Sequence, residues 1–316
     1  MAKIISLFSG VGGIELPFIE NGHDVVFAND FEEKAVLTYN LNFKHNALCE
    51  DITHIEEKTI PDGDILIGGF PCQPFSVAGY RKGFEDTRGT LFFDVCRILK
   101  EKKPSVVFLE NVKNLVSHDN GNTFQIILRT LRDLGYHVKH AVLNASEYGN
   151  MPQNRERIYI IGFLEEEHYR HFEFPDPVPL TTKLSDIIDF NNPIDKKYSY
   201  TKSKYPKIYN AFLKIKPKIG SVYQWRRQYV RENKSGVCPC LTANMGTGGH
   251  NVPLIYTKNG LRKLTPRECF NVQGFPQSFK LPTNLADSAL YKQAGNSVCV
   301  GVVRRIVDSI EKALQY

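Results

Sequence analysis

The sequence predicts an α/β protein whose larger domain is an open, doubly wound, mostly parallel sheet, joined to a smaller and irregular second domain. In residues 1–163, short apolar runs alternate with segments of helical periodicity, a pattern typical of a parallel sheet with helices on both faces. The pattern changes at "FPDPVP" (174–179), which resembles a domain boundary. We therefore expect residues 1–180 with 284–316 to form the larger domain and residues 181–283 the smaller one.

The strands and helices of the larger domain follow from hydrophobic spacing. Helices are expected in the segment that ends at Gly22, in 89–103, in 122–135 with Gly135 as its stop, and in 297–315, an amphipathic segment that should return to the larger domain. Strands are expected at 3–8, 24–29, 64–69, 104–111, 137–145 and 157–163. Active residues in such a sheet are expected at the carboxyl ends of the strands.

Composition excludes several classes of protein. The chain has 316 residues, of which 42% are hydrophobic and 23% charged, as in ordinary globular domains. It shows no signal-peptide pattern and no run of about 18 apolar residues, so we expect a soluble, cytoplasmic protein without membrane contact. Seven cysteines without paired CxxC elements argue against a disulfide framework or a zinc site, and the Cys238–Cys240 pair lacks a second ligand pair. No metal is expected.

Positive charge is concentrated in one segment of the second domain. Residues 196–234 contain twelve Lys or Arg and a single acid, Glu232, so they carry +11, whereas the whole chain carries +6. The same segment holds six tyrosines and Trp225. A charge run is usually a solvated surface, but this asymmetry and the interleaved aromatic residues favour a surface that binds nucleic acid.

A glycine-rich turn follows the first predicted strand. "LFSGVGG" (7–13) opens a helix, and its glycines allow a ligand to approach the backbone closely. Asp30 ends the second strand 17 residues after Gly13, a spacing suited to ribose hydroxyls. Dinucleotide sites and S-adenosylmethionine (AdoMet) sites both use this arrangement, although the glycine spacing is not GxGxxG.

A rigid cysteine lies just past another predicted strand. In "GGFPCQPFSVAG" (68–79), Pro71 and Pro74 stiffen the backbone on either side of Cys72. Glu110 follows the next strand and should stand at a neighbouring carboxyl end. Arg155 and Arg157, two residues apart, share one face if the chain is extended there. A cysteine is most often a packed structural thiol, but these surroundings favour a nucleophile.

These residues lie within blocks that together closely resemble the cytosine-5 DNA methyltransferases, especially the bacterial restriction–modification type. The resemblance covers almost the whole chain outside residues 180–260. The blocks occur in that family's order: "LFSGVGG", "NDFEEKAVLTYNLNF", "EDI", "DILIGGFPCQPFSVAG", "RGTLFFD", "ENVKNL", "QNRERIYIIGF", "RKLTPRECFNVQGFP" and "QAGNSV".

The resemblance implies a class I, Rossmann-like methyltransferase domain and a target-recognition domain, with double-stranded DNA in the cleft between them. It implies that AdoMet methylates carbon 5 of a cytosine flipped out of the duplex, leaving S-adenosylhomocysteine. Cys72 would be the covalent nucleophile, Glu110 would bind ring N3 and the exocyclic amine, Arg157 would bind O2, and Arg155 would place Cys72 and the target phosphate. The implied AdoMet residues are Phe8, Gly10, Gly12, Gly13, Asp30, Phe31, Asp51, Ile52, Pro71, Leu91, Asn296 and Ser297. The expected DNA contacts are Ser76, Arg81, Lys82, Arg226, Arg227 and Asn244.

One block departs from the family's pattern. The recognition region of the family usually has a Thr-Leu or Thr-Val dipeptide before a glycine-rich turn, whereas here Cys240 precedes Leu241. A thiol is a weaker hydrogen-bond partner than a hydroxyl, so one backbone contact is lost or Thr242 serves in its place.

Other functions stay open at this point. A transfer-RNA cytosine-5 methyltransferase of the same fold would share the Cys72 chemistry, but the long basic segment and the short chain favour DNA. A catalytically silent DNA-binding module is disfavoured by the intact set of Cys72, Glu110 and the two arginines. A nicotinamide-dependent oxidoreductase is disfavoured by the glycine spacing. We also expect a monomer, and a companion restriction endonuclease encoded nearby.

Overall fold

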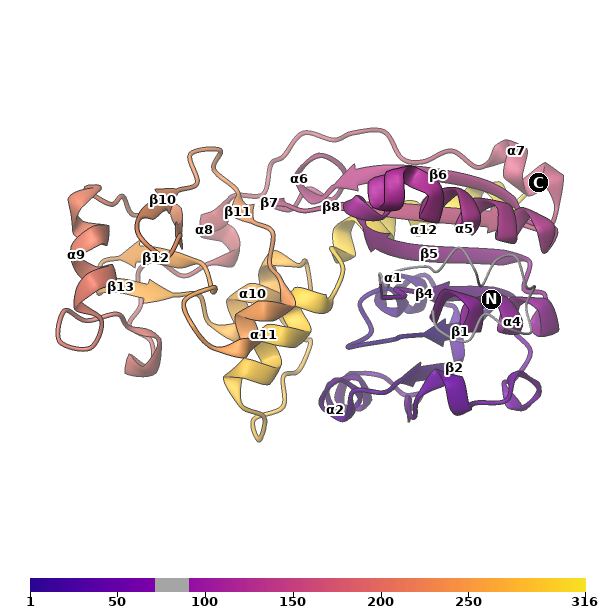
Figure 1. Cartoon of the computed structure of the whole chain (residues 1–316), viewed down its shortest axis with the longest axis horizontal. Helices are drawn as coiled ribbons and strands as arrows, with labels where there is room; N and C mark the ends of the chain where they lie inside the picture. The colour runs from indigo at the N-terminus through magenta and orange to yellow at the C-terminus, as the bar shows by residue number, and fades with distance from the viewer. Residues whose placement is uncertain (72–90) are drawn as a thin grey trace. The chain divides into compact units, whose positions relative to one another are not determined.

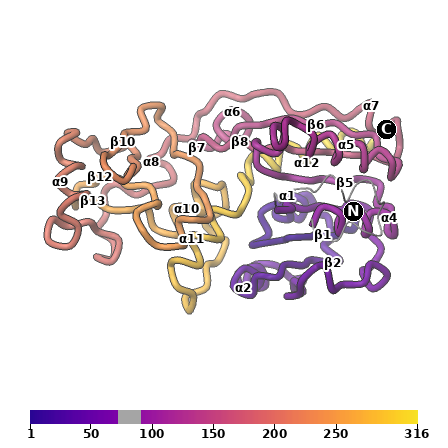
Figure 2. The backbone as a smooth tube through the Cα atoms, in the orientation of Figure 1, coloured from indigo at the N-terminus to yellow at the C-terminus, as the bar shows by residue number. Residues whose placement is uncertain are grey.

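A computed structural model of the chain describes residues 1–71 and 91–316. Cys72, Ser76, Arg81 and Lys82 lie outside the described residues. The chain divides into two compact units, the first of Met1–Leu143, Glu156–Asp176 and Val303–Tyr316, the second of Asn144–Arg155 and Pro177–Val302. Both chain ends therefore belong to the first unit, as the continuous trace of Figure 2 lets the reader follow.

The first unit is built on a seven-stranded sheet with the order β3-β2-β1-β4-β5-β8-β6 (Figure 1). Neighbours from β3 to β5 are parallel, whereas β8 runs antiparallel to β5. The expected mostly parallel α/β sheet is therefore confirmed. The strands are β1 Lys3–Leu7, β2 Asp24–Asp30, β3 Leu48–Cys49, β4 Ile65–Gly68, β5 Val106–Val112, β6 His137–Asn144 and β8 Glu156–Phe163.

Helices cover both faces of this sheet. Their bounds are α1 Glu15–Glu20, α2 Glu33–Asn42, α4 Leu91–Lys102, α5 Asn122–Asp133, α7 Glu166–His171 and α12 Val300–Ala313, with the short 3-10 helices η1 Ile52–His54, η2 Glu57–Thr59 and η3 Lys113–Gly121. The buried faces of α4 and α5 share one apolar core with side chains of β1, β4, β5 and β8. On α1, Phe18 packs edge to face on Phe108 of β5, and Glu20 pairs with Arg304 of α12. The C-terminal helix thus returns to the first unit, as expected.

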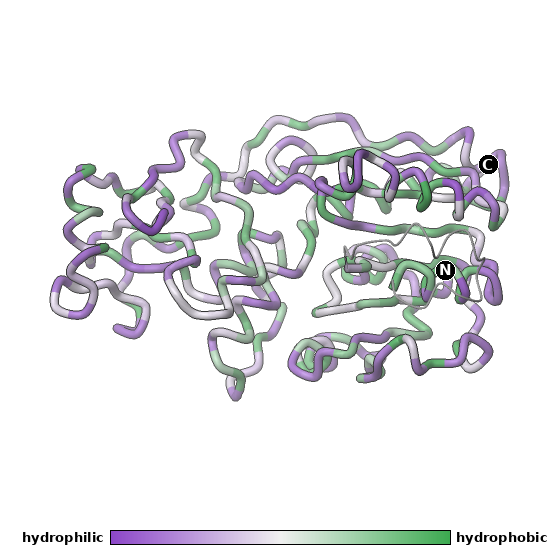
Figure 3. The backbone as a smooth tube through the Cα atoms, in the orientation of Figure 1, coloured by the Kyte–Doolittle hydropathy of each residue, from purple (hydrophilic) through white to green (hydrophobic). Residues whose placement is uncertain are grey.

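Alternation along β5 decides which side chains reach which face. Val107 and Leu109 belong to the core formed with α4 and α5, whereas Phe108 packs against Phe18 of α1. Glu110 therefore lies on the α1 face and Asn111 on the other. Most of β5 is green, the colour of hydrophobic residues, in Figure 3, as expected of a strand that is buried on both faces.

The second unit holds a smaller antiparallel sheet with the order β10-β9-β12-β13, and α9 packs on it through Ile208 and Phe212. The strands are β7 Gln153–Asn154, β9 Val222–Trp225, β10 Val230–Glu232, β11 Cys238–Pro239, β12 Leu254–Thr257 and β13 Gly260–Lys263. The helices are α6 Ala145–Tyr148, α8 Leu184–Ile187, η4 Lys196–Tyr198, α9 Pro206–Lys214, η5 Ala243–Thr247, α10 Pro266–Val272 and α11 Asp287–Asn296.

The unit boundaries differ from the predicted domain boundaries at three places. Residues 144–155, 177–180 and 284–302 were expected in the larger domain, but they belong to the second compact unit. The reason is packing: β7 pairs with β11, and α11 contacts α10 and η5. Among the described residues, no helix combines the length and apolar character needed to cross a membrane.

Candidate functional site

The glycine-rich turn leaves the end of β1 and enters α1. Phe8, Gly10 and Gly12 have positive φ angles of 55°, 54° and 85°. A Cβ on Gly12 would lie 2.0 Å from the ring of Phe43, so only glycine fits beneath that ring. A Cβ on Gly10 would meet nothing within 4 Å, so the space beside this residue is open to a ligand. The turn is thus shaped for close approach of a ligand at Gly10.

Asp30 and Phe31 stand beside this turn at the end of β2. One carboxylate oxygen of Asp30 accepts from the Gly10 N–H at 2.8 Å, and the other accepts from the Glu32 N–H at 2.8 Å. These bonds hold the carboxylate at the turn, and a carboxylate is an acceptor suited to ribose hydroxyls. The Phe31 ring is 69% exposed, unusual for a large apolar side chain and suited to stacking on a planar ligand.

The other predicted cofactor residues of the first unit differ in accessibility. Asp51 is exposed, and its carboxylate caps η1 by accepting from the Thr53 N–H at 3.0 Å and hydroxyl at 2.8 Å, which holds its pKa below the usual range. Pro71 is also exposed, and Leu91 is half-buried. Ile52 is 3% exposed and its side chain belongs to the core, so its backbone is the part available to a ligand.

Glu110 and Arg157 form an ion pair on the α1 face of the sheet. Glu110 pairs in register with Tyr159, so Arg157 is its diagonal neighbour across the antiparallel β5–β8 pair. Arg157 Nε lies 3.1 Å from Glu110 Oε1, and the two side chains are only 13% and 10% exposed. A carboxyl and a guanidinium, both nearly buried, are thus fixed side by side at a strand end.

The chain that enters Cys72 passes beside Glu110. In the parallel β4–β5 pair, Gly68 lies opposite Leu109, which confirms the expected adjacency of these two strand ends. A Cβ on Gly69 would lie 3.5 Å from Glu110 Oε2. On the other face, the buried Asn111 side chain donates to the Phe70 carbonyl at 2.7 Å. Asn111, which sequence reasoning missed, therefore anchors the residue two positions before Cys72.

A buried carboxyl lies beneath the glycine-rich turn and was also missed. Glu15 is 1% exposed, and its Oε1 accepts from the Ser6 hydroxyl at 2.5 Å, while the Ser9 hydroxyl donates to Ser6 at 2.9 Å. Among the described residues, Glu15 Oε2 has no hydrogen-bond partner. Burial raises the pKa of Glu15 to about 7. Its position four residues after the buried Val11 is the signal that could have indicated a core-facing acid.

Arg155 has different surroundings from Arg157. It belongs to the second unit, is 2% exposed, and donates to the backbone carbonyls of Leu241 at 2.7 Å, Gly295 at 3.2 Å and Ser297. The two arginines were expected on one face, but these contacts of Arg155 lie in the second unit, whereas Arg157 pairs with Glu110 of the first. The catalytic role of Arg155 stays a prediction, and its contacts point to a positioning role.

Asn296 and Ser297 follow directly at the end of α11. Asn296 is exposed, whereas the Ser297 hydroxyl is buried and has no hydrogen-bond partner among the described residues. A buried hydroxyl without a partner is costly, and a ligand that accepts from it or donates to it would remove that cost.

Two of the predicted DNA-contact residues occupy a hairpin tip. The strands β9 and β10 are joined by Arg226–Tyr229, where the Arg226 N–H donates to the Tyr229 carbonyl at 2.8 Å. Arg226, Arg227 and Tyr229 are all exposed. Arg227 has a φ of 61°, a conformation that costs a non-glycine residue about 1–2 kcal/mol. Strain at an exposed arginine favours a functional role.

Asn244 lies in a loop of residues 240–251, here named the glycine loop. It is exposed, and its side-chain oxygen accepts from the Thr242 hydroxyl at 2.5 Å. Its backbone carbonyl accepts from the side chains of Thr247 at 2.8 Å and Asn251 at 3.3 Å. These bonds orient Asn244 locally and engage its acceptor oxygen rather than its amide N–H groups.

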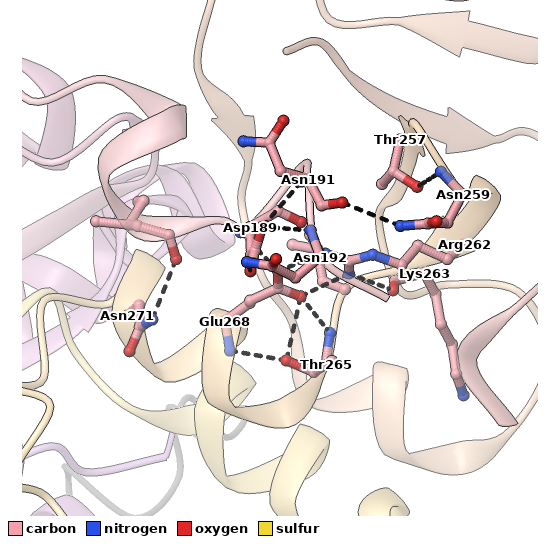
Figure 4. Close-up of polar contacts among 12 residues, drawn as sticks. Asp189, Asn191, Asn192, Thr257, Asn259, Arg262, Lys263, Thr265, Glu268 and Asn271 are labelled. Carbon is pink, nitrogen blue, oxygen red and sulfur yellow. Dashed lines mark hydrogen bonds and ion pairs between the residues drawn. The ribbon is translucent and has the colours of Figure 1, made fainter. Parts of the chain in front are cut away.

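A buried ion pair joins β13 to α10 in the second unit (Figure 4). Arg262 donates to both carboxylate oxygens of Glu268 at 2.7 Å, and the side chains are 4% and 8% exposed. Glu268 also accepts from the Thr265 N–H at 2.8 Å, which forms a capping box at the start of α10. The pair is structural, and no group of three or more His, Cys, Asp or Glu suited to a metal occurs in the described residues.

Known proteins match this chain along almost its whole length. The family described as C-5 cytosine-specific DNA methylase matches residues 2–312. The Type II methyltransferase M.Bsp6I of Bacillus sp. (strain RFL6) is 56% identical, covering 99% of this chain and 100% of that protein. The Type II methyltransferase M.HhaI of Haemophilus parahaemolyticus is 40% identical, covering 99% of this chain and 95% of that one.

Among solved structures, the Dnmt2 methyltransferase of S. pombe is similar with a TM-score of 0.75 at 21% identity, covering 100% of both chains. At that identity the likeness supports the fold alone, and it agrees with the mostly parallel α/β sheet.

Proposed function

The chain belongs to the C-5 cytosine-specific DNA methylase family and is a DNA cytosine-5 methyltransferase, and we propose that Cys72, Glu110 and Arg157 carry its chemistry. The observation that carries this proposal is the nearly buried Glu110–Arg157 pair beside the chain that enters Cys72. The comparisons favour DNA over transfer RNA as the substrate, because the matching family and the two relatives named above are DNA methylases or Type II methyltransferases.

Cytosine carbon 5 is a poor nucleophile, so the enzyme must activate the ring. We propose that the Cys72 thiolate adds to carbon 6, which shifts the ring electrons toward carbon 5. After methylation, loss of the carbon 5 proton restores the double bond and expels the Cys72 thiolate. No net oxidation occurs, and the cysteine returns unchanged. A base flipped out of the duplex is required, because a stacked base cannot be reached.

Glu110 and Arg157 would hold the base while this happens. A carboxyl that donates to or shares a proton with ring N3 relieves the negative charge that develops as the thiolate adds. Arg157, fixed against Glu110 at 3.1 Å, would bind O2 of the base through its guanidinium. Because both side chains are nearly buried, these interactions are stronger than they would be in water.

Family and fold imply an AdoMet-dependent enzyme, and the glycine-rich turn fits that cofactor. The open space at Gly10, the Asp30 carboxylate held beside it and the exposed Phe31 ring suit methionine, ribose and adenine in that order. Asp51 would accept from the adenine amino group, and Phe8, Gly12, Gly13, Ile52, Pro71, Leu91, Asn296 and Ser297 complete the proposed set. When bound, AdoMet supplies an electrophilic methyl group.

DNA recognition would fall on the second unit. The Arg226–Tyr229 tip and the glycine loop expose arginine and asparagine, which suit guanine and adenine edges. The lysines of residues 196–234 would mostly contact phosphates, which orient the protein without reading sequence. The names of the relatives support a further proposal, protection of host DNA in a restriction–modification system. A companion endonuclease and a monomeric state stay predictions.

Bisulfite sequencing of plasmid from a host that expresses the protein tests this function and reveals the DNA word. We expect one short sequence with a protected cytosine. In the Cys72→Ser variant, turnover should fall by several orders of magnitude, because an alkoxide is scarcely populated near neutral pH. Cys49→Ser, at an exposed cysteine, is the matched control. Retention of even a tenth of the activity by Cys72→Ser would rule out the nucleophile.

A further inference from the structure

Three polar side chains from separate segments are buried around Leu241 in the second unit. Gln153 and Gln273 are 0% exposed and Arg155 is 2% exposed. Buried polar groups are stable only when they are hydrogen-bonded, so their partners define what the cluster holds in place. Gln153 donates to the Gln273 side chain at 3.0 Å, and Gln273 donates to the Ala294 carbonyl at 2.6 Å. The cluster thus links β7, α10 and α11.

Both peptide groups of Leu241 are bound by this cluster. Its N–H donates to Gln153 Oε1 at 3.1 Å, and its carbonyl accepts from Arg155 Nη1 at 2.7 Å. The strand pair β7–β11 ends just before these contacts, so the two side chains continue the pairing where the backbone ladder stops. Leu241 is the residue from which the exposed part of the glycine loop departs. The cluster therefore sets where that loop begins.

The second guanidinium nitrogen of Arg155 binds a different segment. Nη2 donates to the carbonyls of Gly295 and Ser297, which flank Asn296 at the end of α11. A single rigid, planar group thus holds the start of the glycine loop and the Gly295–Ser297 segment at once. Arginine suits this task because its donors are fixed in one plane, whereas lysine offers one rotating ammonium.

The glycine loop also rests directly on α11. A Cβ on Gly246 would lie 2.3 Å from the Ser288 carbonyl oxygen, and a Cβ on Gly295 would lie 2.2 Å from the Thr242 carbonyl carbon. At both glycines the two backbones are therefore in contact, without space for even a methyl group. A displacement of the loop must move α11, or open this contact and the Arg155 hydrogen bonds.

We propose that Arg155 is a positioning residue that couples DNA binding at the glycine loop to AdoMet binding at Asn296 and Ser297. The inference rests on the function proposed above, which assigns these ligands to the two segments. Ligands that order two segments held by one side chain stabilise each other's binding, and the coupling is reciprocal. DNA that carries the recognised word should tighten cofactor binding, and cofactor should tighten DNA binding by the same factor.

Titration calorimetry with S-adenosylhomocysteine, with and without a duplex carrying the word found by bisulfite sequencing, measures this factor without turnover. We expect a wild-type factor of about 5–150-fold. Arg155→Lys keeps the charge but cannot bind the three carbonyls together, so its factor should fall close to one. Gly246→Ala should lower the factor by displacing the loop from α11 while leaving Arg155 intact. If Arg155→Lys does not fold, the Gly246→Ala variant still tests the coupling.

Arg262→Lys is the matched control, because Arg262 is equally buried in the same unit but binds Glu268. It should keep the wild-type factor even if its melting temperature falls. The inference is overturned if the wild type shows no coupling, if both Arg155→Lys and Gly246→Ala keep it, or if Arg262→Lys loses it equally. A protein that binds no S-adenosylhomocysteine at all would instead contradict the proposed function.

Discussion

At the scale of single residues, the burial of Glu15 makes the free energy of unfolding depend on pH. Its pKa is about 7 in the folded protein, against an ordinary value of 4.5, because it is buried beside Ser6 under the glycine-rich turn. Between these pH values the unfolded chain has lost the proton and the folded chain still holds it. Raising the pH through this window therefore lowers the free energy of unfolding, by a total on the order of 3 kcal/mol.

Glu15→Gln tests this directly, because glutamine has nearly the same shape and cannot titrate. We expect the difference in unfolding free energy between wild type and Glu15→Gln to change by about 3 kcal/mol between pH 4.5 and pH 7, with wild type losing stability as pH rises. Urea denaturation at several pH values measures it. Glu33→Gln, at an exposed site of α2, is the control. If the unfolding free energies of Glu15→Gln and Glu33→Gln depend equally on pH, Glu15 is not a buried, neutral acid.

Arg227 shows a second residue-scale effect, backbone strain at an exposed site. Glycine adopts a φ of 61° without strain but loses more entropy on folding, so Arg227→Gly should leave stability unchanged within about 1 kcal/mol. The same variant should bind the recognised duplex about 1–3 kcal/mol more weakly. Arg227→Lys keeps the charge but loses bidentate bonding, so it should relax discrimination at one base pair. If both variants discriminate between base pairs as the wild type does, Arg227 does not contact the bases that define the recognised word.

At the scale of elements, the Arg262–Glu268 pair ties β13 to α10. Removing one partner leaves a buried charge without its counterion, so Glu268→Ala should cost about 3–5 kcal/mol of unfolding free energy. The double variant Arg262→Met with Glu268→Leu removes both charges and should recover much of that loss. Chemical denaturation of the three proteins gives the comparison. A double variant less stable than Glu268→Ala would show that the pair itself, and not the isolated charge, dominates.

The β5–β8 pair shows how an element creates a site. Because β8 runs antiparallel to β5, the register that places Tyr159 opposite Glu110 brings Arg157 to the diagonal position on the same face. A one-residue slip would send Arg157 to the opposite face. The geometry of the Glu110–Arg157 pair therefore depends on a strand register that is set by the apolar residues around it.

At the scale of the whole molecule, recognition and chemistry should be separable. The blocks that resemble the methyltransferase family flank residues 181–261, and the +11 segment lies inside this range. Exchanging residues 181–261 for the matching segment of a relative with another target should move methylation to that relative's word. Bisulfite sequencing of plasmid DNA reads the result. A folded chimera that still methylates the original word would place recognition elsewhere in the chain.

Much of the molecule follows from the amino-acid sequence by itself. Hydrophobic spacing alone placed β1, β2, β4, β5, β6 and β8 with the helices α1, α4, α5 and α12, because burial repeats locally along a strand or helix. The residue types around Cys72 and the turn at 7–13 indicated the chemistry, since few side chains serve as nucleophile, acid or ribose acceptor. The order of the blocks then identified the family.

Only the tertiary structure decided which side chains meet. Arg155 and Arg157 are two residues apart, yet one binds backbone carbonyls of the second unit and the other binds Glu110. The buried Asn111 and Gln153 carried no separate sequence signal, because polar residues are usually exposed. The direction of β8 and the place of α11 in the second unit depend on pairing and packing between distant segments. Local periodicity shows which residues of a helix or strand are buried, but it does not show which other segment they pack against.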